Sequence, residues 1–140
     1  MKGCKMDLTE KANAFFKADT YAVETTGIEI LEVKPNYAKC RLSVMLKHLN
    51  AANTVMGGAI FTLADFTFAV AANSGGVMTQ SLTAQIAYLG VAKGRTLFAE
   101  ANCVKDGKST CYFIVDITDE LGVKVASVTV TGFKKIGRTV

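Results

Sequence analysis

One segment of the chain is apolar or small at almost every position and is too long for a strand. From Gly57 to Ala72 it contains no proline and a single charged residue, Asp65. The sequence Asn73-Ser74-Gly75-Gly76 follows it, and glycine readily takes the left-handed conformation that usually ends a helix. The pattern therefore predicts a long buried helix over this segment.

On a helical wheel, this segment is apolar nearly all round, apart from one narrow stripe of small and polar side chains. The stripe consists of Gly58, Thr62, Asp65, Ala69 and Asn73. A buried carboxylate has to be paired, hydrogen-bonded or protonated, because burying a bare charge costs several kcal/mol. Asp65 is therefore either a structural acid, bonded to the backbone or to Thr62, or a catalytic general base or nucleophile.

Shorter periodic segments flank this helix. An amphipathic helix is expected from about Asp7 to Lys17, followed by a connector from Asp19 to Thr26. Alternating apolar and polar positions predict strands at residues 28–33, 37–44, 81–89, 95–105, 109–118 and 123–134. Pro35-Asn36 is expected to turn the first strand into the second, and Asp106-Gly107 to form a two-residue type I′ hairpin turn. Another turn is expected at residues 119–122.

This order of elements predicts an α+β fold. A single apolar helix among antiparallel strands hides its whole circumference only if the sheet wraps around it. We therefore expect an antiparallel sheet of five or six strands wrapped around one long central helix, with residues 1–140 forming a single domain. One sheet around one helix leaves a sheet edge and a face open, so at least a homodimer is expected.

Composition and charge exclude several classes of protein. Half of the residues are hydrophobic, which is ample for a core, but polar residues interrupt every long apolar run, so no membrane span is expected. Residues 1–16 lack the apolar centre of a signal peptide, which favours a cytoplasmic location. The net charge of +4 is too small and too dispersed for nucleic-acid binding, although it would suit an anionic ligand such as a nucleotide thioester.

The metal-binding residue types are few and scattered. The chain has one histidine, His48, and four cysteines without C-x-x-C spacing, which argues against a zinc site. Cys40, Cys103 and Cys111 lie in predicted strands, where we expect them to act as small buried hydrophobic residues. No G-x-S-x-G sequence is present, so a serine triad built on His48 is not expected.

Three short motifs point to one family. His48-Leu49-Asn50 is followed by Gly57-Gly58 and then by Leu63-Ala64-Asp65 inside the predicted helix. This pattern resembles the hotdog-fold acyl-CoA thioesterases of the phenylacetic-acid-degradation (PaaI) type, which carry H-x-N, then H-G-G, then L-A-D in the central helix. Met56 stands where the family has the histidine of H-G-G. The resemblance runs from about Phe15 to Gly137. It implies a hotdog fold and a cofactor-independent hydrolysis of a medium-chain or aryl acyl-CoA.

The double glycine lies at or beside the predicted helix N-terminus, where backbone N–H groups lack helical partners and the helix dipole is positive. Glycine lets a ligand approach the backbone closely, so Gly57 is a candidate oxyanion-hole donor; close packing of helix on sheet is the alternative. Gly57 and Asp65 are eight residues apart, or roughly 12 Å along a helix axis. Both cannot touch one carbonyl carbon, so Asp65 has to come from a second subunit.

The resemblance implies four catalytic residues. The Gly57 N–H polarises the thioester carbonyl, and Asn50 orients that group or the substrate. Asp65 of the facing subunit activates water or attacks the carbonyl directly. Ser81 positions the water, with Thr83 as the fallback, although a plain strand-edge hydroxyl is an equal alternative for Ser81.

We expect the substrate to be bound by His48, Met56, Gly58, Thr83, Arg95, Lys105 and Lys108, and we expect no metal ligands. Asp106-Gly107-Lys108 resembles the basic turn that relatives place near the nucleotide phosphates, and Lys134 is a further candidate there. A solvated hairpin tip is the alternative for these cations, and a hydrogen-bonded structural role is the alternative for His48.

The expected partner is an acyl-CoA substrate, bound by a homodimer or by a homotetramer built as a dimer of dimers; no nucleic acid or membrane is expected. Two other functions remain open. A non-catalytic acyl-CoA-binding hotdog domain is favoured by Met56. A dehydratase or hydratase is disfavoured because no histidine lies on the central helix.

Overall fold

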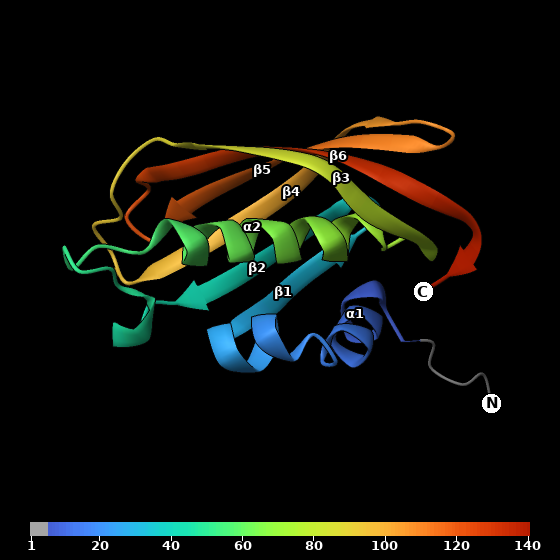
Figure 1. Ribbon diagram of the computed structural model, residues 1–140. Coiled ribbons are helices and arrows are strands. Elements are labelled where there is room, and N and C mark those ends of the chain that lie inside the picture. The colour runs from blue at the N-terminus through green and yellow to red at the C-terminus, as the bar shows by residue number, and fades with distance from the viewer. Residues whose placement is uncertain (1–5) are drawn as a thin grey trace.

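The computed structural model describes residues 6–140, apart from the side chain of Ile136; Cys4 lies outside the described residues. The helical elements are α1 (Leu8–Phe16), a π-helix (Tyr21–Thr26), a 3-10 turn (Leu46–His48) and α2 (Gly57–Ala72). The strands are β1 (Ile28–Lys34), β2 (Tyr37–Ser43), β3 (Val77–Tyr88), β4 (Thr96–Asp106), β5 (Thr110–Asp119) and β6 (Lys124–Thr139). The expected α+β architecture is confirmed, with six strands in one sheet and α2 lying across its concave face (Figure 1).

The two edges of the sheet differ in what covers them. The strand order is β1-β2-β4-β5-β6-β3, and every neighbouring pair is antiparallel. α1 covers the β1 edge, where the Thr9 hydroxyl accepts a hydrogen bond from the Val33 N–H at 3.0 Å. At the other edge, β3 pairs only with β6 and is exposed throughout residues 80–85. An exposed edge strand of this kind invites pairing with another chain.

α2 begins at the double glycine and ends just before Asn73, in agreement with the predicted start and stop signals, and it forms the centre of the core. Its C-cap is Asn73, and Gly76 just beyond has a φ of 84°, a left-handed conformation that glycine takes without a Cβ penalty. Phe68 points into the sheet and packs edge to face on Phe113 of β5, with ring centroids 5.3 Å apart. Burying a ring of this size contributes about 1.5–3 kcal/mol, so this side of α2 anchors the fold.

The sheet does not hide the whole circumference of α2, contrary to the expectation. Leu63 and Ala71 are 0% exposed, whereas Gly58 and Asp65 on the opposite side are exposed. The sheet curls around one side only, and α1 reaches α2 through an edge-to-face contact of Phe16 with Phe66 at 5.7 Å. The stripe of small and polar residues is therefore the face of α2 that the chain leaves open.

The connector expected from Asp19 to Thr26 contains regular structure. Residues Tyr21–Thr26 form a π-helix, which ends where the Gly27 N–H donates to the Ala22 carbonyl oxygen at 3.0 Å. Gly27 has a φ of 89°, so its lack of a Cβ permits this ending. No apolar periodicity marks so short a helix, which is why the sequence did not predict it.

The predicted type I′ turn at Asp106-Gly107 is wrong. Asp106 pairs with Cys111, so four residues separate this pair and residues 107–109 form the loop. Neither Asp106 nor Gly107 has the positive φ that this turn type needs. The Lys134 ammonium donates to the Asp106 carboxylate and to the Gly107 carbonyl oxygen, and these bonds stabilise the wider loop.

Two strands are longer than predicted because they pair with each other. β3 begins at Val77 and β6 continues to Thr139, and these two residues are register partners. None of the helices within residues 6–140 is long and apolar enough to span a membrane.

Candidate active site

The N-terminus of α2 presents two unused backbone donors. The N-cap residue Met56 donates its N–H to the His48 carbonyl oxygen at 2.8 Å, but its side chain forms no cap. Neither the Gly57 N–H nor the Gly58 N–H has an acceptor among residues 6–140. Both donors lie at the positive end of the helix dipole, so they suit an oxygen that gains negative charge.

Tyr88, at the end of β3, fixes this first helical turn. Its hydroxyl donates to the Gly57 carbonyl oxygen at 3.1 Å. A Cβ on residue 57 would lie 2.9 Å from the Tyr88 hydroxyl oxygen, whereas a Cβ on Gly58 would meet nothing within 4 Å. Gly57 is therefore closely packed against Tyr88 of β3, as the packing alternative expected, and it also keeps a free N–H. No role was expected for Tyr88, because its only signal in the sequence is an aromatic residue at the end of a predicted strand.

One cavity begins at this turn, and a second cavity adjoins it. One, of about 280 Å³, is lined by Gly57 and Tyr88 among others. The second, of about 460 Å³, extends to Lys93 and Arg95. The two cavities have three lining residues in common, namely Thr54, Val55 and Ala92. They therefore form a continuous depression that runs from the free N–H groups to a pair of cations.

Two acids hold the loop that carries these cations. Asp119 is 3% exposed and accepts four backbone hydrogen bonds, from Lys93, Gly94, Leu121 and Val123, at 2.8–3.0 Å. Burial acts to raise the pKa of Asp119, but these N–H donors outweigh it and hold the pKa below its ordinary value. The Glu120 carboxylate accepts from the Arg95 N–H at 2.6 Å. Arg95 is therefore presented by a fixed backbone.

Asp65 lies on the open face of α2 beside a different cavity, of about 570 Å³, whose walls include Asp19, Tyr21 and Phe66. Partial burial raises the pKa of Asp65, and the nearby Asp19 carboxylate raises it further. The Thr62 hydroxyl donates to the Gly58 carbonyl oxygen at 2.8 Å. The structural alternative in which Thr62 bonds to Asp65 is therefore not realised.

Within one chain, Gly57 and Asp65 serve separate cavities. The cavity beside Asp65 shares no lining residue with the cavity at Gly57 or with the one that adjoins it. Gly57 and Asp65 therefore remain roughly 12 Å apart along the axis of α2. One chain alone does not bring the expected oxyanion donor and the expected carboxylate together.

His48 is a structural residue, which corrects its expected role in substrate binding. It is 5% exposed, and its Nδ1 accepts a hydrogen bond from the Met45 N–H at 2.8 Å. Nε2 therefore carries the ring hydrogen and donates it to the Thr26 carbonyl oxygen at 2.7 Å. Both ring nitrogens are used, so His48 ties the end of the π-helix to the loop before α2.

Asn50 shapes that loop instead of touching Gly57. Its Oδ1 accepts hydrogen bonds from the Ala52 N–H at 2.9 Å and the Thr54 N–H at 3.1 Å. No hydrogen bond joins Asn50 to Gly57 within the part of the chain that the structure describes. Its influence on the site passes through Thr54, which lines both adjoining cavities.

A bulge in β3 distinguishes Ser81 from Thr83. Ser81 pairs with Gly132 and Thr83 with Thr131, so β3 has one extra residue, Leu82, between two pairs that are adjacent on β6. A Cβ on Gly132 would meet the Phe68 ring of α2 at 3.0 Å, so that position faces the helix. Directly opposed residues share a face of the sheet. Ser81 therefore lies on the helix side and Thr83 on the far side.

The expected cations do not gather in one chain. Arg95 precedes β4, whereas Lys105 is near its other end, roughly 30 Å away at ~3.3 Å per residue. Lys108 follows in the exposed loop beyond β4, so the solvated-tip alternative describes both lysines here. The Met56 side chain is 57% exposed and is not among the residues that line these cavities.

The three cysteines within residues 6–140 are mainly core residues. Cys40 and Cys111 are buried and Cys103 is half-buried, and burial raises the pKa of the Cys40 thiol to about 12. Among the described residues, no group of three or more His, Cys, Asp or Glu side chains could hold a metal ion.

Comparison with known proteins identifies the class. The family model of the thioesterase superfamily matches residues 52–126. The acyl-coenzyme A thioesterase PaaI of Escherichia coli K12 is 32% identical over 119 residues, which cover 84% of this chain and 84% of the relative. The solved structure of the E. coli PaaI protein from the phenylacetic acid degradation operon superposes with a TM-score of 0.84 at 28% identity, covering 95% of this chain and 99% of that one.

A second solved structure, a hypothetical thioesterase protein from Streptococcus pneumoniae TIGR4 with coenzyme A, has a TM-score of 0.81 and 28% identity, covering 89% of this chain and 99% of that one. The fold and the family match define a thioester-hydrolysing enzyme with the hotdog fold. The chain belongs to the thioesterase superfamily and, within it, to the PaaI type. The fold and family that the sequence motifs indicated are thereby confirmed.

Proposed function

We propose that this enzyme hydrolyses a medium-chain or aryl acyl-CoA at a site shared by two subunits. The observation that carries the proposal is that α2 presents two candidate catalytic groups at two separate cavities. Gly57, whose N–H is free, lines one cavity, and Asp65, a carboxylate with a raised pKa, lines another. The names of the relatives, with acyl-coenzyme A in one and coenzyme A in another, support the substrate class.

Pairing of two β3 edges would create such a site. An edge strand exposed over residues 80–85 can continue the sheet into a second copy about a two-fold axis. The open stripes of the two α2 helices would then face each other, with Gly57 of one chain near Asp65 of the other. The proposed catalytic unit is therefore a homodimer, and a homotetramer would be two such units.

The cavities suggest how the substrate lies. The thioester carbonyl oxygen accepts the Gly57 N–H, and the nucleotide phosphates extend toward Lys93 and Arg95 along the connected depression. The acyl group enters the partner's cavity beside Asp65, whose walls include Phe61 and Phe66. With Tyr21, three aromatic rings line this cavity of about 570 Å³, which suits a medium-length chain or an aromatic ring.

Asp65 supplies the chemistry in this proposal. As a base it removes a proton from water while the water oxygen bonds to the carbonyl carbon, and the C–S bond then breaks to release the thiolate of CoA. As a nucleophile it would bond to the carbonyl carbon itself, and water would cleave the resulting anhydride. A pKa raised by burial and by Asp19 makes its carboxylate more basic. In this proposal Ser81, which lies on the helix side of β3, hydrogen-bonds the water.

Subunit mixing tests the shared site. Asp65→Asn should lower turnover at least ~10²-fold, the scale of losing a general base, and Gly57→Val should block the first turn because a Cβ there meets Tyr88 at 2.9 Å. The two variants are unfolded together, refolded and assayed by thiol release from decanoyl-CoA. Random pairing makes about half of the dimers mixed, each with one intact site of two, so about a quarter of wild-type activity should return.

Each variant refolded alone is the control, and mass-tagged subunits establish that exchange has occurred. If both groups served one site from the same chain, every site in the mixture would keep a defect. A fully exchanged mixture no more active than its parents would therefore rule out the shared site. Binding of acyl-CoA by the wild-type protein without any thiol release would instead support a non-catalytic binding domain.

A further inference from the structure

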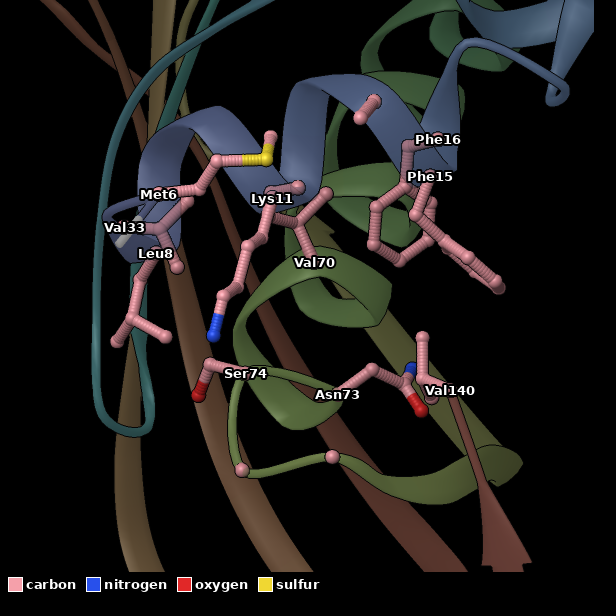
Figure 2. A pocket seen from close by; sticks show the side chains of 14 residues that line it. Met6, Leu8, Lys11, Phe15, Phe16, Val33, Val70, Asn73, Ser74 and Val140 are labelled. Carbon is pink, nitrogen blue, oxygen red and sulfur yellow. The ribbon is translucent and has the colours of Figure 1, made fainter. Parts of the chain in front are cut away.

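A separate cavity lies between α1 and the C-terminal end of α2 (Figure 2). It has a volume of about 570 Å³. Its walls come from α1, β1, the end of α2, the loop that follows α2, and Val140. It shares no lining residue with the three cavities of the proposed active site. Phe16 lines this cavity, and Phe66 lines the cavity of Asp65. The two rings pack edge to face and so separate the two cavities.

Most of the wall is apolar. All but one of its polar side chains already form hydrogen bonds within the chain. Asn73 accepts a hydrogen bond from the Thr79 N–H at 2.8 Å and donates to the Ala69 carbonyl oxygen at 2.7 Å. The Ser74 hydroxyl donates to the Ala71 carbonyl oxygen at 2.7 Å and accepts from a backbone N–H at 2.9 Å. A polar ligand such as a sugar or a nucleotide base would find few partners here and would lose its hydration.

The exception is Lys11. Figure 2 shows its side chain extending from α1 toward the loop that carries Ser74, with the ammonium at its tip. Within residues 6–140, the Lys11 ammonium makes no ion pair and no hydrogen bond, and no acidic side chain lines the cavity. As far as the described residues go, the cavity therefore combines apolar walls with one positive charge that has no ion-pair partner.

We propose that this cavity binds a free fatty acid, with the aliphatic chain between α1 and α2 and the carboxylate at Lys11. Apolar walls stabilise a chain in proportion to the apolar surface that leaves water. One ammonium matches one carboxylate, whereas a cationic amphiphile would be repelled. The proposal goes beyond thioester hydrolysis and does not depend on it, because it concerns binding of an acid with no CoA present.

Calorimetric titration with three ligands of equal chain length tests the head group: decanoate, decan-1-ol and decyltrimethylammonium, at pH 8 and without acyl-CoA. Lys11 is exposed, so we expect saturable binding of one decanoate per chain with an affinity about twofold to fivefold above that of decanol, within the range for an exposed ion pair. Lys11→Met should abolish this preference. Lys17→Met, a matched change at an exposed lysine outside the cavity, should keep it.

Two aromatic variants locate the bound chain. Phe15 is 49% exposed and lines this cavity, so Phe15→Ala should weaken both decanoate and decanol while the protein still folds. Tyr21 is 66% exposed and lines the cavity of Asp65, so Tyr21→Ala should leave both affinities unchanged. Circular dichroism of each variant checks the fold.

Three results would overturn the proposal: no saturable binding of decanoate, equal binding of decanoate and decanol, or a preference that survives Lys11→Met. A loss of affinity in Tyr21→Ala but not in Phe15→Ala would place the acid in the active site as a reaction product and would also overturn it. Thiol release from acyl-CoA is measured separately, so failure of this proposal and failure of the proposed hydrolysis are distinguishable.

Discussion

Gly57→Ala perturbs the closest contact at the N-terminus of α2. The new Cβ would lie 2.9 Å from the hydroxyl oxygen of Tyr88 and 3.0 Å from its Cζ, whereas ordinary contacts begin at 3.4 Å. Tyr88 therefore has to retreat by about 0.5 Å. A displacement of that size lengthens the 3.1 Å hydrogen bond from Tyr88 to the Gly57 carbonyl oxygen beyond a useful distance.

The change in stability should be small. Losing the hydrogen bond costs about 0.5–1.5 kcal/mol, while alanine in place of glycine in a helix gains up to about 1 kcal/mol. The Tyr88 ring is 54% exposed, so it can swing toward solvent instead of straining the core. The free energy of unfolding should thus change by less than about 1 kcal/mol. Gly58→Ala is the matched control, and it should gain about 0.5–1 kcal/mol because its Cβ meets nothing within 4 Å.

The change in activity should be large by comparison. Moving Tyr88 alters the cavity that it shares with Gly57, and small misplacements in an active site lower rates by about 10- to 100-fold. The measurement is kcat/KM for decanoyl-CoA, from thiol release with a thiol reagent. In a Tyr88→Ala background, the same Gly57→Ala change should cost much less, since the ring is gone. A folded Gly57→Ala enzyme with wild-type kcat/KM would refute the reasoning.

Three further predictions concern single side chains. Asp19→Asn removes one of the two causes that raise the pKa of Asp65, so the acidic limb of kcat/KM against pH should move to lower pH; an unmoved limb would mean that Asp65 does not control it. Asp119→Asn should lower Tm at pH 7. The native pKa of Asp119 is depressed, so its carboxylate stabilises the fold at any pH above the ordinary aspartate pKa. This stabilisation is lost as the pH falls through the native pKa, so the difference in Tm between wild type and variant should shrink in acid. A difference in Tm that does not depend on pH would contradict this. Met56→His restores the family's H-G-G and should leave turnover equal or raise it several-fold; a large fall in a folded variant would show that Met56 shapes the acyl pocket.

The central helix and the strand pattern could be predicted from sequence because their signals are local. An unbroken apolar segment ended by Asn73 and Gly76 fixes α2 with little reference to the rest of the chain, and the observed bounds agree. The same holds for the hairpin of β1 and β2, where Asn36 takes the positive φ, 59°, that the turn requires. The sequence also determined that Gly57 opens a helix and that Asp65 lies in its polar stripe.

The arrangement of the site depended on contacts between residues far apart in the chain. The bulge in β3 placed Ser81 on the helix side and Thr83 on the other, because one extra residue reverses the alternation of faces that a sequence pattern assumes. His48 is structural because Met45 and Thr26 occupy both of its ring nitrogens. Neither outcome is visible in local periodicity.

Tertiary structure also decided which face of α2 stays open and what meets its first turn. Tyr88 reaches Gly57 only because β3 crosses the end of α2, and Arg95 and Lys105 are far apart because an extended strand separates them. Periodicity along a chain reports which side of an element is apolar, but the sheet's curvature, strand order and register determine what lies against that side. For this protein, sequence therefore determined the elements and the candidate groups, while long-range packing determined which of those groups share a cavity.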